Sequence, residues 1–530
     1  MIKEPTKEQK EIINCSRNIV VTARPGSGKT YTVIEKIAVV MKDLLDFQGV
    51  IAISFTNKAS DELFTRCKHR GIHTKQSFFG TIDKFYISQI IIPFAKHLTH
   101  SLVEWNIYTT SMGDATFDAL NNLGNHPDPE QEKLLLCALK QGKIFLNICG
   151  ETALYILQNV PSAIQYLKAK YRYIFIDEYQ DCGQIQHDIF ILLVENGLCG
   201  CAVGDTKQAI YGFTNRFPKY LISLINRPDF DHFEITENHR CHQSISDYSL
   251  ALMGVNRPIS DDLRIFKVSI AGTEYTIAEK IDLNLIAIKS KYHVANNNQV
   301  AILCKNNGTV QIMNNALNTP SKVYTDTKLD LENSDWARLF CELLTSFFNP
   351  EIFAVDIAER YFIEEINHKK YSKTLSLCND IFSCSSNRLY TQYDVFIKLA
   401  KLIYPTHENS IATKLLYEVL YDESLLHNYS PAANNEINIM TIHKSKGLEF
   451  NIVFHMDLYK WIFPYQNCPK DEYDQALNLH YVGITRAIDA CYMILASKRY
   501  RANHDDFCKT EQSPFLSIEG LSERRKNIRW

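Results

Sequence analysis

A glycine-rich segment near the start of the chain has the residue types that bind phosphate groups. Residues 18–22 (NIVVT) read as a short buried strand, and a helical pattern follows from Lys29. Between them Gly26 and Gly28 let backbone N–H groups turn toward phosphate oxygens, and the helix N-terminus adds partial positive charge. This strand–loop–helix context predicts that Lys29 reaches the β- and γ-phosphates of a nucleotide and that Thr30 binds Mg²⁺. The loop consists of Ala23, Arg24, Pro25, Gly26, Ser27, Gly28, Lys29 and Thr30.

Two acidic residues follow a second apolar run. Residues 173–176 (YIFI) predict a buried strand, and Asp177 and Glu178 come directly after it. Ligands of open parallel sheets bind at the carboxyl ends of the strands. Asp177 suits a Mg²⁺ ligand, and Glu178 suits the base that orients an attacking water. By itself such a pair is typical of an ordinary strand-end turn, but the phosphate-binding loop upstream favours the catalytic interpretation.

The composition is that of a globular protein with several domains. The chain has 530 residues, of which 45% are hydrophobic and 11% aromatic, which excludes a disordered chain. Its length predicts about three or four domains at roughly 150 residues each. The net charge of −3 provides no global basic field, so a polyanionic ligand would need a local basic channel.

Features of location and redox state indicate a soluble cytoplasmic protein. The 15 cysteines are scattered without a CxxC pair, which favours reduced thiols over a metal site. The N-terminus is too polar for a signal peptide, and no apolar run approaches about 20 residues, so no membrane is expected as a partner. The basic cluster Arg524-Arg525-Lys526 is typical of a solvated tail.

Six more motifs lie in order along the chain. They are residues 53–59 (ISFTNKA), 79–85 (FGTIDKF), 203–213 (VGDTKQAIYGF), 236–240 (TENHR), 439–450 (IMTIHKSKGLEF) and 481–487 (YVGITRA). Together with the phosphate-binding loop and Asp177-Glu178, they resemble the motifs of superfamily 1A DNA helicases of the UvrD/Rep type. One departure is Asp83, which stands where that family usually has His.

The resemblance implies an ATP site in a cleft between two halves of the molecule. Arg240 and Arg486 match the two arginines that reach the γ-phosphate from across the cleft, and an arginine finger accelerates hydrolysis by about 10³–10⁵. Gln208 matches the glutamine that senses the γ-phosphate, and Gln9 matches the glutamine that reads adenine. The remaining ATP-binding positions are Glu449 near the ribose, Gly447 beside it, and Tyr31 and His239, where the family has Arg and Tyr around the adenine.

The resemblance also implies a track for single-stranded DNA. Phe55 and Phe213 match positions whose rings stack on bases, an interaction worth about 1–3 kcal/mol per base. Tyr211, Asn57, Lys58 and His443 lie in motifs that border the same strand. Two alternatives stay open: Lys58 as an ordinary solvated lysine, and either Phe as a core residue.

The expected fold class is α/β, with two RecA-like P-loop domains built from parallel sheets flanked by helices. The motif order implies that each domain is interrupted by a mainly helical insertion. We expect domain 1A at residues 1–92 and 170–231, insertion 1B at 93–169, domain 2A at 232–345 and 432–530, and a reduced insertion 2B at 346–431.

A narrower resemblance concerns the biological role. The short 2B and the strings FFGTIDKF, IFIDEYQD and NHRCHQSI are similar to the GajB subfamily, the helicase-like subunits of Gabija antiphage defence systems. This implies an ATP- and Mg²⁺-dependent translocase with 3′→5′ polarity, acting on DNA with single-stranded regions. It also implies a hetero-oligomer with a GajA-like nuclease that carries an OLD-type ATPase head and a Toprim domain. The alternatives are a stand-alone UvrD-like repair helicase and a DNA- or nucleotide-sensing regulatory subunit that does not unwind DNA.

Overall fold

The computed structural model describes residues 4–54, 57–101, 103, 105–108, 110–111, 116–205, 219–324, 327–332, 334–350, 352–362, 364–405, 408–465, 467–501 and 506–530. Within these ranges it gives the backbone alone for Asn57, Lys58, Asp61, Glu62, Glu365, Ile366 and Arg501. No helix in the described ranges is long and apolar enough to cross a membrane.

The first sheet has six parallel strands in the order β3-β2-β6-β7-β1-β8. Apolar side chains alternate along β1, so Ile19 and Val21 pack on one face and Val20 on the other. Burial on both faces is typical of a parallel sheet that is covered by helices on each side. The strands are β1 (Asn18–Ala23), β2 (Gly49–Ser54), β3 (Phe78–Thr81), β6 (Tyr171–Ile176), β7 (Cys199–Gly204) and β8 (Phe230–Ile235).

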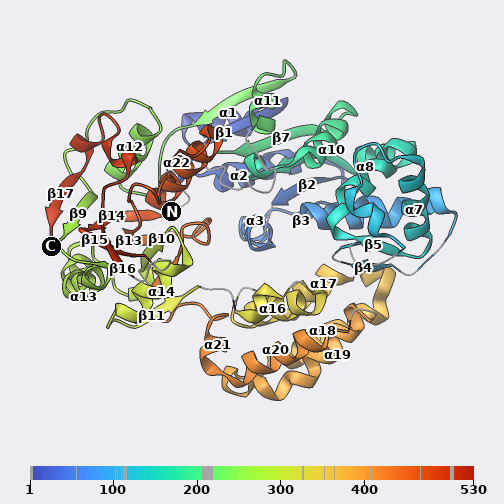
Figure 1. Ribbon diagram of the computed structural model, residues 1–530. Helices are drawn as coiled ribbons and strands as arrows, with labels where there is room; N and C mark the ends of the chain where they lie inside the picture. The colour runs from blue at the N-terminus through green and yellow to red at the C-terminus, as the bar shows by residue number, and fades with distance from the viewer. Residues whose placement is uncertain are drawn as a thin grey trace.

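Helices cover both faces of this sheet (Figure 1). One face packs against α1 (Lys7–Asn14), α2 (Lys29–Asp43) and α3 (Asn57–His69). The other face packs against α8 (Cys149–Asn159), α10 (Gln184–Glu195) and α11 (Lys219–Ile225). The sheet therefore holds the start of α2 and the ends of β1 and β6 in one rigid frame.

A mainly helical insertion connects β3 to β6 and shares the core of α8 and α10. It also contains a short parallel pair of strands, β4 (Asn106–Tyr108) and β5 (Lys143–Phe145), which the sequence did not predict. Its other elements are α4 (Ile82–Phe85), the π-helix Tyr86–Ile91, α5 (Ile92–Phe94), α6 (Lys96–Thr99), α7 (Pro129–Lys140) and α9 (Pro161–Lys170).

The second sheet has seven parallel strands in the order β11-β12-β10-β13-β14-β9-β17. Helices α12 (Gln243–Leu252) and α22 (Lys470–Thr485) cover one face, and α13 (Glu274–Lys291) and α14 (Asn307–Ala316) cover the other. The strands are β9 (Ile265–Ile270), β10 (Val300–Cys304), β11 (Ser321–Val323), β12 (Ile437–Thr441), β13 (Phe450–His455), β14 (Ala487–Ala496) and β17 (Lys526–Arg529). An antiparallel pair, β15 (Lys498–Arg501) and β16 (Asp506–Lys509), follows β14.

The C-terminal basic cluster is part of the fold, so its interpretation as a solvated tail was wrong. Lys526 begins the edge strand β17, and both Arg524 and Arg525 are 8% exposed. Arg524 donates to the carbonyls of Arg257 and Pro258, and Arg525 donates to the Tyr248 hydroxyl at 3.3 Å. These guanidinium groups donate hydrogen bonds to carbonyl and hydroxyl acceptors in the second half of the chain, so they belong to its folded interior and do not extend into solvent.

A second helical group interrupts the second sheet between β11 and β12 and has its own core around Trp336. Figure 1 shows it in yellow and orange, apart from the two sheets. Its helices are α15 (Lys328–Leu331), α16 (Asp335–Phe347), α17 (Ala354–Tyr361), α18 (Glu364–Phe382), α19 (Tyr393–Ile403), α20 (Ser410–Tyr421) and α21 (Glu423–His427).

The chain is thus an α/β protein with two parallel sheets flanked by helices, as the sequence predicted. The division into four parts at particular residues stays a proposal. Strand β8 crosses the boundary expected at residues 231 and 232, and the core of the second helical group begins at Leu329, before the boundary expected at 346.

Candidate active site

The phosphate-binding loop connects β1 to α2 as the sequence predicted. Gly26 and Gly28 have φ of +71° and +82°, the left-handed region that glycine tolerates best. The Ser27 N–H donates to the Arg24 carbonyl at 3.2 Å, which closes the turn before the helix. Lys29 and Thr30 then begin α2, and half-buried Tyr31 follows in the same turn. The loop therefore presents a helix N-terminus at the carboxyl end of β1.

Two buried polar groups of this loop lack a hydrogen-bond partner among the described residues. They are the Ser27 hydroxyl and the Arg24 Nη1. Unsatisfied buried polar groups are costly, and native proteins rarely retain them without a function. A hydroxyl and a guanidinium beside a glycine-rich turn are the groups that a phosphate would satisfy. The loop therefore fits the triphosphate of a nucleotide.

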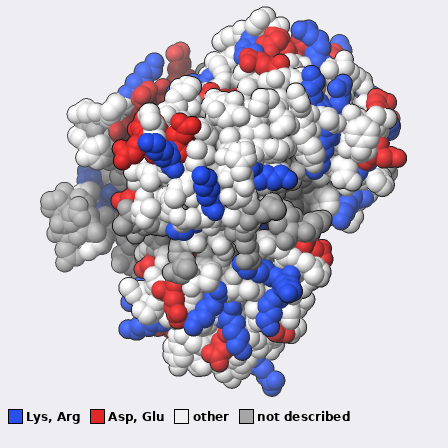
Figure 2. All heavy atoms as spheres, turned by 90° about the vertical axis from the view of Figure 1, so that its right-hand side faces the viewer, with Lys and Arg blue, Asp and Glu red and all other residues white. Residues whose placement is uncertain are grey.

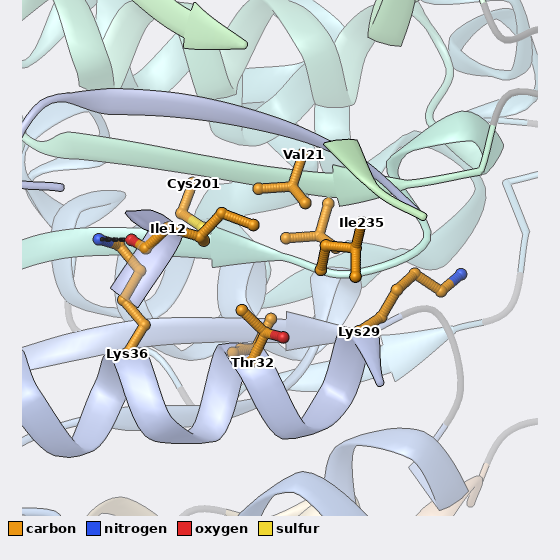
Figure 3. A pocket seen from close by; sticks show the side chains of 9 residues that line it. Ile12, Val21, Lys29, Thr32, Lys36, Cys201 and Ile235 are labelled. Carbon is orange, nitrogen blue, oxygen red and sulfur yellow. Dashed lines mark hydrogen bonds between the residues drawn. The ribbon is translucent and has the colours of Figure 1, made fainter. Parts of the chain in front are cut away.

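Lys29 extends from the start of α2 toward the acidic end of β6. Its Nζ lies 3.2 Å from Glu178 Oε1. Figure 3 shows it pointing away from the narrow apolar gap formed by Ile12, Val21 and Ile235. Burial alone would lower the pKa of Lys29, but the carboxylates of Glu178, Asp177 and Asp205 raise it above its ordinary value. The lysine is therefore a firmly charged cation at the site.

Asp177 and Glu178 follow β6 in a tight turn. The Asp177 N–H donates to the Ile53 carbonyl at 3.0 Å, and Asp177 Oδ1 accepts from the Glu178 N–H at 2.9 Å. Glu178 has φ of +55°, an uncommon conformation for a residue with a Cβ. Such backbone strain is often found at functional sites, where the surrounding structure holds the side chain in one direction.

The electrostatics of Glu178 depend on its neighbours. Burial would raise the pKa of this carboxyl, but Lys29 and Lys446 lower it to about 2, and the Gln180 amide donates to its second oxygen. With Lys29 this close, Glu178 is a weak base. It gains proton affinity when Lys29 moves toward another anion, because the nearest positive charge then leaves.

The two residues expected to bind Mg²⁺ lie beside the Lys29–Glu178 ion pair, one at the start of α2 and the other in the turn after β6. Thr30 stands next to Lys29 in α2, and Asp177 stands next to Glu178 after β6. No group of three His, Cys, Asp or Glu side chains able to hold a metal occurs in the described part of the chain. This donor set fits Mg²⁺, which usually binds through one or two protein oxygens, water and substrate phosphates.

Gln9 lies against the phosphate-binding loop. It is 2% exposed, and its side chain accepts from the Thr6 N–H and donates from Nε2 to the Ser27 carbonyl at 3.2 Å. A Cβ on Gly28 would approach Nε2 to 2.9 Å, so an alanine at this position would displace the Gln9 amide. The predicted adenine-reading glutamine is thus placed at the edge of the loop.

Residues after β8 reach the same loop. The His239 N–H donates to the Gly26 carbonyl at 2.7 Å. A Cβ on Gly26 would collide with the Arg240 side chain and lie 2.5 Å from Asn238 Oδ1. Arg240 Nη2 in turn lies 2.5 Å from Glu449 Oε1. The expected ribose contact, Glu449, is paired with one of the two expected fingers.

Arg486, the second expected arginine finger, follows directly after α22. It is 2% exposed and donates from Nε to the Val482 carbonyl and from Nη1 to the Leu448 carbonyl, both at 3.2 Å. Burial and nearby Arg240 lower the pKa of Arg486 to about 10, while Glu178 and Glu449 act in the opposite direction. It therefore remains protonated at neutral pH. Gly447, with φ of +84°, makes the turn between Lys446 and Leu448.

Two further residues, Lys446 and Gln180, enter the site in the structure without a role that the sequence predicted. Lys446 Nζ lies 2.6 Å from Asp181 Oδ2 and belongs to the motif at 439–450. Gln180 accepts from the Asp205 N–H at 2.9 Å while its amide donates to Glu178. Both residues belong to motifs identified in the sequence, and membership of these motifs was the one signal that could have indicated a role in the site. Asp181 is 265 residues from Lys446 and Asp205 is 25 residues from Gln180, so sequence alone could not pair them.

The expected DNA track is described only in part. Phe55, Tyr211 and Phe213 lie outside the described residues, as does Gln208, the expected γ-phosphate sensor of the ATP site. Asn57 and Lys58 are described by their backbone at the start of α3. His443 follows β12 and is half-buried. Burial and Lys305 lower its pKa to about 4, so the imidazole is neutral at pH 7. A neutral imidazole can stack on a base or donate one hydrogen bond.

Basic and acidic side chains are mixed on one face of the molecule. Figure 2 shows Lys and Arg interspersed with Asp and Glu in the upper part of that face and also in the lower part, which the second helical group forms. Exposed lysines of that group include Lys369, Lys373, Lys398 and Lys401.

Comparison with known families places the chain among helicases. A model of the UvrD/REP helicase N-terminal domain matches residues 5–131 and 130–228, and a model of the UvrD-like helicase C-terminal domain matches residues 360–498. The two regions that match the N-terminal model contain the phosphate-binding loop and Glu178. The region that matches the C-terminal model contains Lys446, Glu449 and Arg486.

Three curated relatives cover nearly the whole chain. The Gabija protein GajB of Bacillus cereus (strain VD045) is 27% identical over 527 residues, which are 93% of this chain and 96% of the relative. A probable DNA helicase II homolog of Mycoplasma genitalium is 23% identical, with 91% and 83% covered. The ATP-dependent DNA helicase PcrA of Staphylococcus epidermidis is 21% identical, with 94% and 84% covered.

Proposed function

Because the chain belongs to the UvrD/Rep helicase family, we propose that it is a DNA-dependent ATPase that translocates 3′→5′ on single-stranded DNA. We further propose that it serves as the helicase-like subunit of a Gabija-type antiviral complex. The observation that carries the ATPase proposal is the contact between the phosphate-binding loop and the segment after β8, where the His239 N–H donates to the Gly26 carbonyl at 2.7 Å. This contact brings Arg240 to the loop that also carries Lys29.

In the proposed reaction Lys29 exchanges its partner. It leaves Glu178, 3.2 Å away, and binds the outer phosphates of ATP. The proton affinity of Glu178 then rises, so this carboxylate orients the attacking water and accepts its proton. Mg²⁺, bound by Thr30 and Asp177, would neutralise charge on the phosphate oxygens.

The second half of the chain supplies the opposing positive charge. Arg240 exchanges Glu449 for a phosphate oxygen, and Arg486 reaches the same group from the end of α22. Planar guanidinium groups suit the charge that spreads over the transferred phosphoryl group. Gln208 is the proposed γ-phosphate sensor, and Gln9 the proposed reader of adenine, with Tyr31 and His239 on either side of the base.

Coupling to DNA is proposed through residues at the carboxyl ends of the strands. Asn57 and Lys58 begin α3 after β2, and His443 follows β12, so the two sheets would each grip one section of the strand. The rings of Phe55, Tyr211 and Phe213 are proposed to stack on bases. Closing and reopening the cleft would then shift one grip relative to the other.

The proposed role in defence is supported by similarity and by size. The match to the Gabija protein GajB covers 96% of that relative, whereas the match to PcrA covers 84% of a longer chain. The second helical group, with its core from Leu329 to Tyr429, is the insertion that we interpret as reduced. A reduced insertion suits a subunit whose motor works within a complex, with a GajA-like OLD/Toprim nuclease as the proposed partner.

Three measurements on the purified chain test these proposals. Single-stranded DNA should raise ATP turnover in the presence of Mg²⁺, and Phe213→Ala should reduce this stimulation more than the basal rate. A chain whose turnover ignores DNA would be a regulatory switch and would contradict the motor. Unwinding of a long duplex by the isolated chain would favour a repair helicase. Co-purification with the product of an adjacent OLD-type nuclease gene would support the complex.

A further inference from the structure

A lysine is buried in the core beneath the phosphate-binding loop. Lys36 lies on α2, two turns after Lys29, and is 1% exposed. Its stem lies among Ile12, Thr32 and Cys201, as Figure 3 shows. No carboxylate forms an ion pair with Lys36 within the described ranges. A buried cation without such a partner is costly unless hydrogen-bond acceptors surround its ammonium group.

The ammonium group of Lys36 binds the end of α1. Its Nζ donates to the Ile12 carbonyl at 3.0 Å and to the Cys15 carbonyl at 2.5 Å. Helix α1 ends at Asn14, and its own last turn contains no basic residue. The final carbonyls of a helix lack intrahelical donors and carry partial negative charge. Lys36 therefore supplies, from α2, the cation that the end of α1 lacks.

Helix α1 carries the residue proposed to read the base. Gln9 stands near its start, and its Nε2 donates to the Ser27 carbonyl in the phosphate-binding loop at 3.2 Å. Glu8 accepts from the Thr236 N–H at 2.8 Å and from its hydroxyl at 2.6 Å, which fixes the same end of α1 to the segment after β8. The opposite end is fixed to α2 by Lys36. The position of Gln9 relative to the loop thus depends on both attachments.

We propose that Lys36 is a positioning residue for base selection, because it holds the Gln9 helix at a fixed distance from the helix that binds the phosphates. This rests on the proposed role of Gln9. Lys36 contacts no nucleotide itself and acts through α1. Removing its charge would release the end of α1, and Gln9 would then meet adenine in a less defined position. The loss should fall on discrimination between bases and leave phosphate binding largely intact.

Fluorescent mant-ATP and mant-GTP, titrated without DNA, measure the effect directly. Lys36→Met keeps the length of the side chain and removes the charge. We expect it to weaken mant-ATP binding by about fivefold, the worth of one lost hydrogen bond, and to leave mant-GTP binding nearly unchanged. The GTP-to-ATP ratio of dissociation constants should therefore fall about fivefold. Lys42→Met, an exposed lysine of the same helix, is the matched control and should keep the ratio.

A double variant separates positioning from a general structural effect. In the Gln9→Ala background, Lys36→Met should leave the ratio unchanged, because the reader through which Lys36 acts is already gone. An equal fall of the ratio in both backgrounds, or an unchanged ratio in Lys36→Met alone, would overturn the proposal. If Lys36→Met does not fold, Lys36→Gln, which keeps one donor, is judged by the same ratio. Since binding is measured without DNA, a wild-type chain that binds ATP but ignores DNA would contradict only the proposed motor.

Discussion

Lys446 and Asp181 form a buried ion pair that joins the two sheets. Lys446 Nζ lies 2.6 Å from Asp181 Oδ2, and the side chains are 12% and 6% exposed. Asp181 belongs to the turn after β6, in the first sheet, whereas Lys446 belongs to the turn after β12, in the second. The pair lies beside Glu178, whose pKa Lys446 helps to lower. Lys446 thus both lowers the pKa of the proposed base Glu178 and pairs with Asp181 across the two sheets.

Lys446→Met should favour an open cleft. Removing one member of a buried pair leaves the other charge in a low-dielectric environment, at a cost of about 3–5 kcal/mol. We expect the radius of gyration of the nucleotide-free chain, measured by small-angle X-ray scattering, to increase. Asp181→Asn combined with Lys446→Met should be less open than Lys446→Met alone, because no buried charge is then uncompensated.

The exposed pair Lys460–Glu511 provides the comparison. Its Nζ and Oε2 lie 2.8 Å apart, but the side chains are 44% and 66% exposed. Exposed pairs contribute about 0–1 kcal/mol, so Lys460→Met should leave the scattering profile unchanged. An equal response of both variants would mean that the Lys446–Asp181 contact does not hold the sheets together.

Gly26→Ala should weaken ATP binding by more than the strain of its backbone explains. An alanine with φ near +71° costs about 1–2 kcal/mol, and its Cβ would also collide with Arg240 and Asn238. Gly71→Ala is the control, because Gly71 has φ of +74° and nothing within 4 Å of the added Cβ. Gly71→Ala carries the backbone strain alone, so Gly26→Ala should lose at least as much thermal stability, and only Gly26→Ala should bind mant-ATP poorly. Equal binding in both would contradict the contact between the loop and the segment after β8.

Arg486→Ala should separate binding from turnover. The guanidinium stays charged at pH 7 because its pKa, lowered by burial and by Arg240, is still about 10. Its loss should reduce kcat by on the order of 10³ or more, with ATP affinity within a few-fold of wild type. Lys29→Ala should abolish turnover as well. Phosphate release and mant-ATP titration measure the two quantities, and normal turnover in Arg486→Ala would rule out its role as a finger.

Two buried histidines, one at the end of β13 and one in α22, should make stability depend on pH. His480 Nδ1 and His455 Nε2 lie 3.0 Å apart, and both residues are fully buried. Burial lowers the pKa of His455 to about 4, and burial together with the neighbouring His455 lowers the pKa of His480 well below its ordinary value. Between about pH 6.5 and 4 the unfolded chain therefore binds more protons than the folded one. The free energy of unfolding should fall on acidification by up to about 1.4 kcal/mol per pH unit for each histidine.

Urea unfolding at pH 7.5 and 5.5 tests this expectation. His480→Leu should reduce the difference between the two midpoints, because one titrating group is removed. The exposed His69→Leu should leave the difference as in wild type. A pH dependence that is identical in all three proteins would show that the buried pair does not cause it.

The sequence predicted local features of the site better than distant contacts. The strand, loop and helix around Lys29 and the carboxylates after β6 follow from short-range patterns, and the structure places both as expected. The Lys446–Asp181 pair depends on two segments whose relative position is set by the packing of whole sheets. The same limit applies to Arg525, for which the sequence indicated a solvated side chain. In the structure β17 forms the edge of the second sheet, and Arg525, just before it, donates to the Tyr248 hydroxyl. Strands β4 and β5 are too short to leave a periodic signal.

The course of the chain after β8 gives Arg240 a particular mechanical position. Strand β8 is an edge strand of the first sheet, and α12, which begins at Gln243, packs on the second. Arg240 therefore stands on the connecting segment itself, with the neighbouring N–H anchored to Gly26. If the proposed cycle rotates the second sheet, the anchor at Gly26 would hold Arg240 near the first sheet, whereas Arg486, which follows α22, would move with the second. The two proposed fingers would then differ in mobility, with Arg240 tied to the phosphate-binding loop and Arg486 arriving only when the cleft closes.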